Sequence, residues 1–448
     1  MSAEMELEAQ IDRWRTYVQA RQAISATDVD ELEDHLRGQV ADLRATGLDD
    51  DEAFLIAIKR LGNLDAVSRE FAREHSERLW KQLALLPHDD AESGPAWREL
   101  AVVLGLAVVA GLAVKAGAAW IPGDTGFVRN ASLLVLPFVA GYFAWRRRVP
   151  ARVSVVLAAA LAALAVLLNV YPYTPSGSTV LLAALHAPVI GWLVVGVAYM
   201  AGRWRSDARR MDFARFTGEL AIYFALIAMG GGVLLGLTAG VLNMLDIDLE
   251  PIFENWVMPL AVPGALVVAA WLVEAKKSVV ENIAPVLTKV FTPLTVLMLV
   301  VVLAALATAD GLLSVDRNLL IVMDAILILV ACLLLYAISA RDPLVRVGLF
   351  DGLQLVLVVA ALAVDAVMLA AILTRIAEFG ASPNKLAALG LNLLLLVHLV
   401  GTAWITVGFL RGKRPFAAVE RWQTRYLPVY GAWALFVVVA FGPVFRFA

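Results

Sequence analysis

Long apolar segments occupy most of this chain and constrain its fold more than any other feature. From Glu99 to Phe447 they follow one another with only short polar turns between them. Each is close to the length of about 20 apolar residues that a helix needs to cross a bilayer. Inside a bilayer only helices and closed barrels satisfy every backbone polar group. The sequence therefore predicts an all-α, polytopic membrane protein.

Eleven segments reach this length, so we expect about eleven transmembrane helices. Counts of ten and twelve stay open, because the fifth and ninth segments are long. The predicted spans are residues 99–120, 128–145, 151–170, 179–201, 216–242, 255–274, 290–309, 319–339, 347–373, 386–409 and 427–445. Before the last span, residues 415–426 predict a short amphipathic helix on the inner leaflet, with Phe416, Val419 and Trp422 facing the lipid.

Charge divides the chain into two parts. The whole sequence has a net charge of −3, but residues 1–90 contain twenty acidic and eleven basic residues, so the remainder is net positive. This asymmetry predicts a soluble head over residues 1–90 and a transmembrane domain over residues 91–448. The chain opens on an acidic, amphipathic stretch, so we expect no signal peptide and a cytoplasmic N-terminus. The absence of a basic cluster in the head disfavours nucleic-acid binding.

Helical periodicity runs through the head. Leu7 and Ile11 belong to the apolar stripe of a first predicted helix, and Leu36 and Val40 belong to the inner face of a second. Two more predicted helices follow, so we expect a small N-terminal cytoplasmic helical bundle. Its acidic outer face is either plain solvation or a docking surface for a cytoplasmic protein partner.

Residues 31–71 resemble a known type of bacterial domain. The matching positions are Glu31-Leu32, Asp34-His35-Leu36, Gly47-Leu48, Glu52-Ala53, Leu61-Gly62-Asn63 and Val67. They are similar to the permease-prefix and HAAS type of domain, which reads as EL-x-DHL, then GL-x-x-x-EA, then LG-(D/N)-x-x-x-V. The resemblance implies a cytoplasmic signalling or adaptor head without catalysis.

Basic residues in the turns predict the orientation. Nineteen Lys and Arg residues lie after even-numbered spans and five lie on the opposite side. Because basic residues are enriched in cytoplasmic loops, we expect the head in the cytoplasm and, with eleven spans, an extracytoplasmic C-terminus. The expected location is the bacterial inner membrane.

Small residues in the fifth span form a possible packing face. Gly232, Gly236 and Gly240 repeat at four-residue intervals, a spacing that lets another helix approach closely. The partner is either another helix of this chain or, in a homodimer, the same helix of a second copy.

Five polar residues from five spans share one predicted depth in the outer half of the bilayer: Lys115, His186, Asp324, Asp365 and Asn392. An ionisable group inside a membrane costs about 2.5–3.5 kcal/mol on insertion scales, so each needs a reason. One interpretation is an outward-facing polar pocket, in which Lys115 pairs with Asp324 or Asp365 and His186 exchanges protons. The other is that each group reaches the interface or makes a structural bond between helices.

A second resemblance covers roughly residues 250–445. Its most specific part is the loop R-I-A-E-F-G-A-S-P-N-K, and the matching residues are Arg375, Glu378, Gly380, Pro383 and Asn384. The loop is similar to that of a bacterial multi-spanning family filed as domain of unknown function four-one-five-three. The resemblance implies a topology and no activity. The alternative interpretation of the loop is a purely structural turn between two helices, in which glycine permits a positive φ and Ser382 or Asn384 caps the next helix.

Motifs for catalysis and metal binding are missing from the sequence. Cys332 is the single cysteine, so this chain alone cannot form a disulfide, a cysteine-based zinc site or an iron–sulfur site. No phosphate-binding loop, zinc-protease motif or serine-hydrolase motif occurs. We therefore expect no catalytic residues, no metal and no cofactor.

Two functions remain from the sequence. The preferred interpretation is a membrane sensor or regulator, in which an outer pocket receives a signal and the head relays it to a cytoplasmic partner. The alternative is a permease or transporter subunit that moves a small solute or ion. A transporter would continue the polar layer inward through His398 towards Asp351, whereas a sensor would have a closed inner half.

Overall fold

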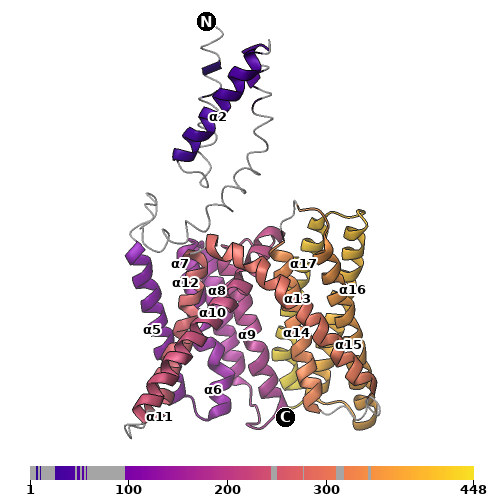
Figure 1. The fold of residues 1–448 in the computed structure, drawn as a ribbon. Coiled ribbons are helices and arrows are strands. Elements are labelled where there is room, and N and C mark those ends of the chain that lie inside the picture. Colours follow the sequence, from indigo (N-terminus) through magenta and orange to yellow (C-terminus); the bar gives the residue numbers. More distant parts are fainter. Residues whose placement is uncertain are drawn as a thin grey trace. The chain divides into compact units, whose positions relative to one another are not determined.

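The chain is described here from a computed structural model. The described residues are 7–8, 11, 26–45, 48–50, 53–54, 57, 96–243, 250–275, 277–308, 317–341 and 345–448. They belong to two compact units, Met1–Gly94 and Pro95–Ala448. Every regular element in the described ranges is a helix (Figure 1).

The first unit has a small apolar core. Its described helix α2 (Ala26–Ala45) confirms the second predicted helix of the head. The buried core residues are Leu7, Ile11, Leu36, Val40, Leu43, Ala53, Phe54 and Ala57. On the outside, Arg37 pairs with Glu8 at 2.7 Å and with Glu33 at 2.9 Å. The bonds from Arg37 hold the pKa of Glu8 below its ordinary value. The predicted fourth helix lies outside the described residues.

The second unit contains the apolar helices. Its elements are α5 (Ala96–Trp120), α6 (Asp124–Asn130), η1 (Ala131–Leu134), α7 (Leu136–Arg146), α8 (Ala151–Val170), α9 (Ser178–Tyr199), α10 (Asp207–Asn243), α11 (Glu250–Ile252), η2 (Phe253–Val257), α12 (Met258–Ala275), α13 (Lys277–Thr308), α14 (Arg317–Ser339), α15 (Leu349–Phe379), α16 (Pro383–Leu410), α17 (Phe416–Phe436), η3 (Val437–Phe441) and α18 (Gly442–Val444).

Eleven stretches in the described part of this unit are long and apolar enough to cross a membrane. Each corresponds to one of the eleven predicted spans. The second span is composite, because α6, η1 and α7 follow one another within it, and the last combines α17, η3 and α18. The chain is therefore compatible with a multi-pass integral membrane protein.

The structure corrects the prediction for residues 415–426. This segment is the first part of α17, which continues without a break into the last span. Pro428 lies inside the helix without ending it. The side chains of Gln423 and Thr424 are fully buried, so these two polar residues lie inside the bundle. An interfacial helix would have turned them towards water.

Two hydrophobic cores fill the second unit. The first is formed by α5, α7 to α10 and α12, and aromatic rings dominate it: Tyr142, Phe143, Tyr199, Phe213 and Phe216. The second is formed by the start of α10 and by α13 to α17, and its buried members are mostly Leu, Val, Met and Ala. Figure 1 shows α13 to α17 beside the earlier helices.

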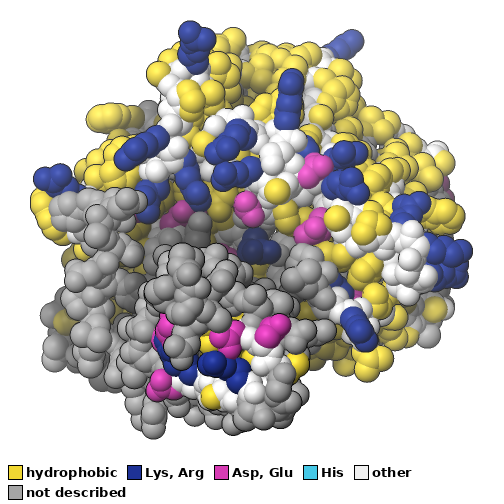
Figure 2. Space-filling model, turned by 90° about the horizontal axis from the view of Figure 1, so that it is seen from above, with side chains coloured by type: hydrophobic (Ala, Val, Ile, Leu, Met, Phe, Trp, Pro, Cys, Tyr) yellow, Lys and Arg dark blue, Asp and Glu magenta, His cyan; other side chains and the backbone are white. Residues whose placement is uncertain are grey.

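Basic side chains spread across one face of this unit, which Figure 2 shows from above. We call it the Arg-rich face; α7, α9, α14 and α16 end there, and Arg or Lys residues follow each of these ends. The opposite face carries the short connection between α15 and α16, and we call it the loop face. The Arg-rich face corresponds to the side that the sequence predicts to be cytoplasmic.

Candidate functional site

Three of the five predicted polar residues come together in the second core. Asp324 lies on α14, Asp365 on α15 and Asn392 on α16. Asn392 Nδ2 donates a hydrogen bond to Asp324 Oδ1 at 2.8 Å. Asp365 and Asn392 are fully buried, and the carboxyl groups of Asp365 and Asp324 are close enough for their charges to interact.

Lys115 is not part of this group, so its predicted ion pair with Asp324 or Asp365 is wrong. Its Nζ donates to the backbone oxygen of Asn255 at 2.7 Å and lies 3.5 Å from the centre of the Trp256 ring. Lys115 belongs to α5, which packs along α12 in the first core. Residues that the sequence predicts at the same membrane depth are therefore not all neighbours in the bundle.

His186 also lies apart from the three residues. It is on α9, half-buried, and its Nδ1 is 2.8 Å from the Leu182 backbone oxygen one turn earlier. This local bond is what a structural histidine in a helix makes. The predicted five-residue pocket thus reduces to Asp324, Asp365 and Asn392.

A second group of polar side chains lies on α16 and α17, closer to the Arg-rich face than Asn392. His398 Nδ1 is 2.8 Å from the Tyr430 hydroxyl, and His398 Nε2 is 2.8 Å from Gln423 Oε1. Gln423 Nε2 donates to Thr402 Oγ1 at 3.0 Å. Of these four residues only Tyr430 is more than slightly exposed.

The partners fix the direction of each hydrogen bond. The Gln423 carbonyl oxygen can only accept, so His398 Nε2 carries the hydrogen. In the neutral ring Nδ1 is then an acceptor, and it receives the Tyr430 O–H. At the other end Thr402 donates to the His398 backbone oxygen at 2.8 Å. Every donor in this chain of bonds has an acceptor.

Asp365 lies within electrostatic range of both groups, through Asp324 and through Tyr430. Among the described residues neither of its carboxyl oxygens has a hydrogen-bond partner. We call the seven residues together the polar column: Asp324, Asp365, Asn392, Thr402, His398, Gln423 and Tyr430.

The polar column covers a large part of a membrane's depth. Asn392 and Thr402 are ten residues apart on α16, which corresponds to about 15 Å along the helix axis. The hydrocarbon layer is about 30 Å thick. The column therefore runs through about half of that thickness, inside a core that is otherwise aliphatic.

A buried ion pair lies at the ends of these helices that face the Arg-rich face. Arg341 Nε is 2.7 Å from Asp351 Oδ1, and Arg341 Nη2 is 3.1 Å from Asp351 Oδ2. The guanidinium also lies 5.0 Å from the ring centre of Phe409 and 4.5 Å from that of Phe416. The side chains of the two charged residues are only 9% and 8% exposed. We call these four residues the Arg341 clamp.

The family-like loop forms a tight turn at the loop face. Gly380 has φ 71°, a conformation that glycine adopts without strain, and Ser382 caps α16, whose first residue is Pro383. Asn384 Nδ2 donates to Ser178 Oγ at 3.2 Å, which ties α16 to the start of α9. Arg375 and Glu378 lie in the last two turns of α15. These contacts are those of a structural turn.

The predicted glycine face on α10 does not contact another helix where it is described. A methyl group added at Gly232 or Gly236 would meet no atom within 4 Å in the described residues. The described residues thus show no helix packed within the chain at these two glycines, and the alternative of packing within the chain stays a prediction. Gly240 lies in α10, but its surroundings are outside what the structure describes. A homodimer contact at this face stays a prediction.

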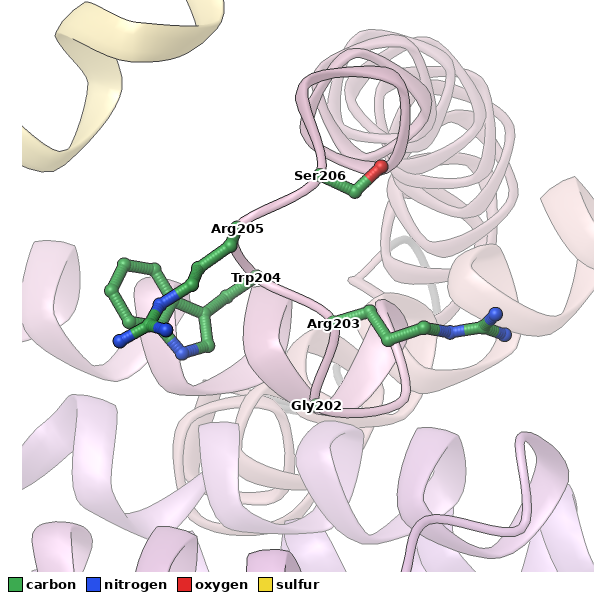
Figure 3. Close-up of a pocket in the computed structure, with 5 residues that line it drawn as sticks. All are labelled: Gly202, Arg203, Trp204, Arg205 and Ser206. Atoms are coloured by element: carbon green, nitrogen blue, oxygen red, sulfur yellow. The ribbon is translucent and has the colours of Figure 1, made fainter.

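A hollow lies elsewhere, in the connection between α9 and α10 on the Arg-rich face. Its lining is Gly202, Arg203, Trp204, Arg205 and Ser206 (Figure 3). The figure shows the Arg205 and Trp204 side chains together on one side and Arg203 pointing to the other. None of these residues belongs to the polar column, so the hollow is a surface feature apart from the candidate site.

Sequence reasoning misses Gln423, because it assigns residues 415–426 to the membrane surface, and it does not single out Thr402 or Tyr430 within their spans. The signal was available: Gln423, Tyr426 and Tyr430 follow at spacings of three and four, which places them on one helix face. Tyr426 stacks on the His398 ring with 4.5 Å between centres.

No group of three His, Cys, Asp or Glu residues suited to a metal ion occurs in the part of the chain that the structure describes. Comparisons of the chain with models of known protein families, with curated proteins and with solved structures find no match.

Proposed function

We propose that this protein is a membrane transporter and that its solute or ion path follows the polar column through α14 to α17. The polar column is the observation that carries the proposal. A transporter needs polar groups along its path, whereas a helix bundle that only anchors a head gains stability from an uninterrupted apolar core. The permease alternative is thus favoured over the sensor.

The energetic argument supports this choice. Charged side chains inside a membrane cost about 2.5–3.5 kcal/mol each on insertion scales and are commonly functional. Asp324 and Asp365 are two such groups in one core, and the ion pair with Lys115 predicted for them does not form. Stability alone therefore gives no account of these two carboxyl groups.

The Arg341 clamp bears on both functions. For a transporter it is the closed gate of one conformational state, since alternating access requires one end of the path to be shut. For a sensor it is a permanent seal of the inner half. The clamp is the specific observation that keeps the sensor as a second candidate, with the head of residues 1–90 as the surface that a cytoplasmic protein would bind.

Water accessibility from the two sides of the membrane separates the candidates. In a Cys332→Ala background, Thr402→Cys places a thiol at the deep end of the polar column. A membrane-impermeant maleimide is then added to right-side-out and to inside-out vesicles that contain the full chain. A transporter predicts labelling of Thr402→Cys from both faces, because its path opens to each in turn.

Val400→Cys is the matched control, because Val400 lies on the same helix and is 50% exposed on the outside of the bundle. In a membrane it faces lipid, so it should react from neither side. Labelling of Thr402→Cys from one face only, or from neither, would reject the transporter. The sensor is tested separately: a cytoplasmic protein that co-purifies with the full chain should be lost when residues 1–90 are removed.

A further inference from the structure

Asp365 has the most unusual environment in the polar column. Its side chain has no exposed surface, and its two carboxyl oxygens lack a partner among the described residues. The Asn392 amide oxygen nearby is also buried and unpartnered there, because the amide nitrogen is the atom that bonds Asp324. Three acceptor oxygens thus share one small region of an apolar core.

Among the side chains that the structure describes, the helices that pack on α15 place no positive charge beside Asp365. In α13 the described basic side chain is Lys289, which is exposed at the surface, and in α16 Lys385 Nζ donates to the backbone oxygens of Arg375 and Gly380 at the loop face. On α14, Asp324 adds a second carboxyl group, and Cys332 is exposed on the outer surface of the bundle. On α16, His398 has both ring nitrogens engaged in hydrogen bonds.

An ionised Asp365 would therefore be a buried charge without a donor or a counter-ion, next to a second carboxyl group. Such a charge costs far more than a buried neutral group. Binding of a proton removes the charge and creates one O–H donor where only acceptors were present.

We infer that Asp365 is a proton-binding site within the polar column. The inference rests on the proposed function and names its coupling ion as a proton. When the path opens to water, Asp365 gives its proton to water and remains as a carboxylate.

Difference infrared spectroscopy of the full chain in lipid vesicles tests the inference, because a protonated carboxyl group has its own carbonyl stretching band. At neutral pH the wild type should show this band, and it should disappear as the pH is raised. Asp365→Asn should lack the band. Tyr430→Phe should keep it, because the Tyr430 hydroxyl makes no hydrogen bond to Asp365.

Each contrary outcome overturns the inference. If the wild type lacks the band, or if the band survives in Asp365→Asn, Asp365 does not carry the proton. A band that disappears at constant pH when sodium chloride replaces choline chloride assigns the site to sodium instead. A wild type without the band overturns the inference even if a variant fails to fold. Because the spectrum reports proton binding and the maleimide reports access, failure of one leaves the other intact.

Discussion

Replacement of Gly401 by alanine should weaken the contact between α16 and α17. A methyl group at this position would overlap the six-membered ring of Trp422. The indole cannot move away freely, since its Nε1 donates to the His398 backbone oxygen at 3.0 Å. The change therefore strains the helix contact and displaces a side chain that holds the polar column in place.

The size of the effect follows from three contributions. Overpacking of a filled core costs about 1–3 kcal/mol, and loss of the indole hydrogen bond costs about 1 kcal/mol. Alanine in a helix gains about 1 kcal/mol over glycine. The net free energy of unfolding should therefore fall by about 1–3 kcal/mol.

Gly352→Ala is the matched control, because Gly352 lies inside α15 and a methyl group there would meet no described atom within 4 Å. It should be neutral or raise the free energy of unfolding by about 0.5–1 kcal/mol. Unfolding in mixed micelles of mild detergent and dodecyl sulfate, followed by circular dichroism, measures both variants. Equal stability of the two, or a loss in Gly352→Ala alone, would refute the packing argument.

Three other replacements give distinct outcomes. Arg341→Met should cost about 3–5 kcal/mol in the same unfolding assay, because it leaves the buried Asp351 carboxylate without its partner; addition of Asp351→Asn should recover part of this loss. Lys115→Met should cost only about 1 kcal/mol through its contact with Trp256 and should leave the Asp365 infrared band unchanged. If a second copy covers the exposed face of α10, Gly236→Ile should lower the yield of cross-linked dimer in membranes.

The eleven spans could be predicted because each depends on a local property, the length of an apolar run. The ends of the spans could be predicted less well, because polar residues near a span end fit both a helix on the membrane surface and a continuation of the span. Residues 415–426 show the difficulty: an amphipathic stretch at a membrane surface and a half-buried helix that carries polar partners have the same periodicity. The hydrogen bond between Gln423 and His398 on the neighbouring helix α16 identifies the second case, and the sequence of residues 415–426 alone does not show it.

The candidate site was predicted in part for a related reason. Depth follows from counting residues along each span, so Asp324, Asp365 and Asn392 were placed correctly at one level. Which helices are neighbours does not follow from such counting. Lys115 has the right depth and the wrong neighbours, because α5 packs on α12 and not on α14 or α15.

The packing of α14 suggests where the polar column could open. Helix α15 packs along much of its length against α16, and α16 packs against α17, whereas α14 makes less extensive contact with these three. The polar bonds between α14 and the other three helices lie near its two ends. At one end Asp324 accepts from Asn392, and at the other Arg341, just after α14, enters the clamp with Asp351.

The polar contacts at the two ends of α14 differ in strength. The end with the weaker contact should separate more easily. A hydrogen bond to a charged group contributes about 1.5–3 kcal/mol, whereas separation of a buried ion pair costs about 3–5 kcal/mol. In the transporter, the loop face should therefore open first. Arg341→Met should reverse this preference by releasing the clamp, so Thr402→Cys should label faster from the Arg-rich face in that variant. Asp324→Asn should leave the labelling rate at that face unchanged; equal acceleration by both variants would show that α14 is not held at two separate ends.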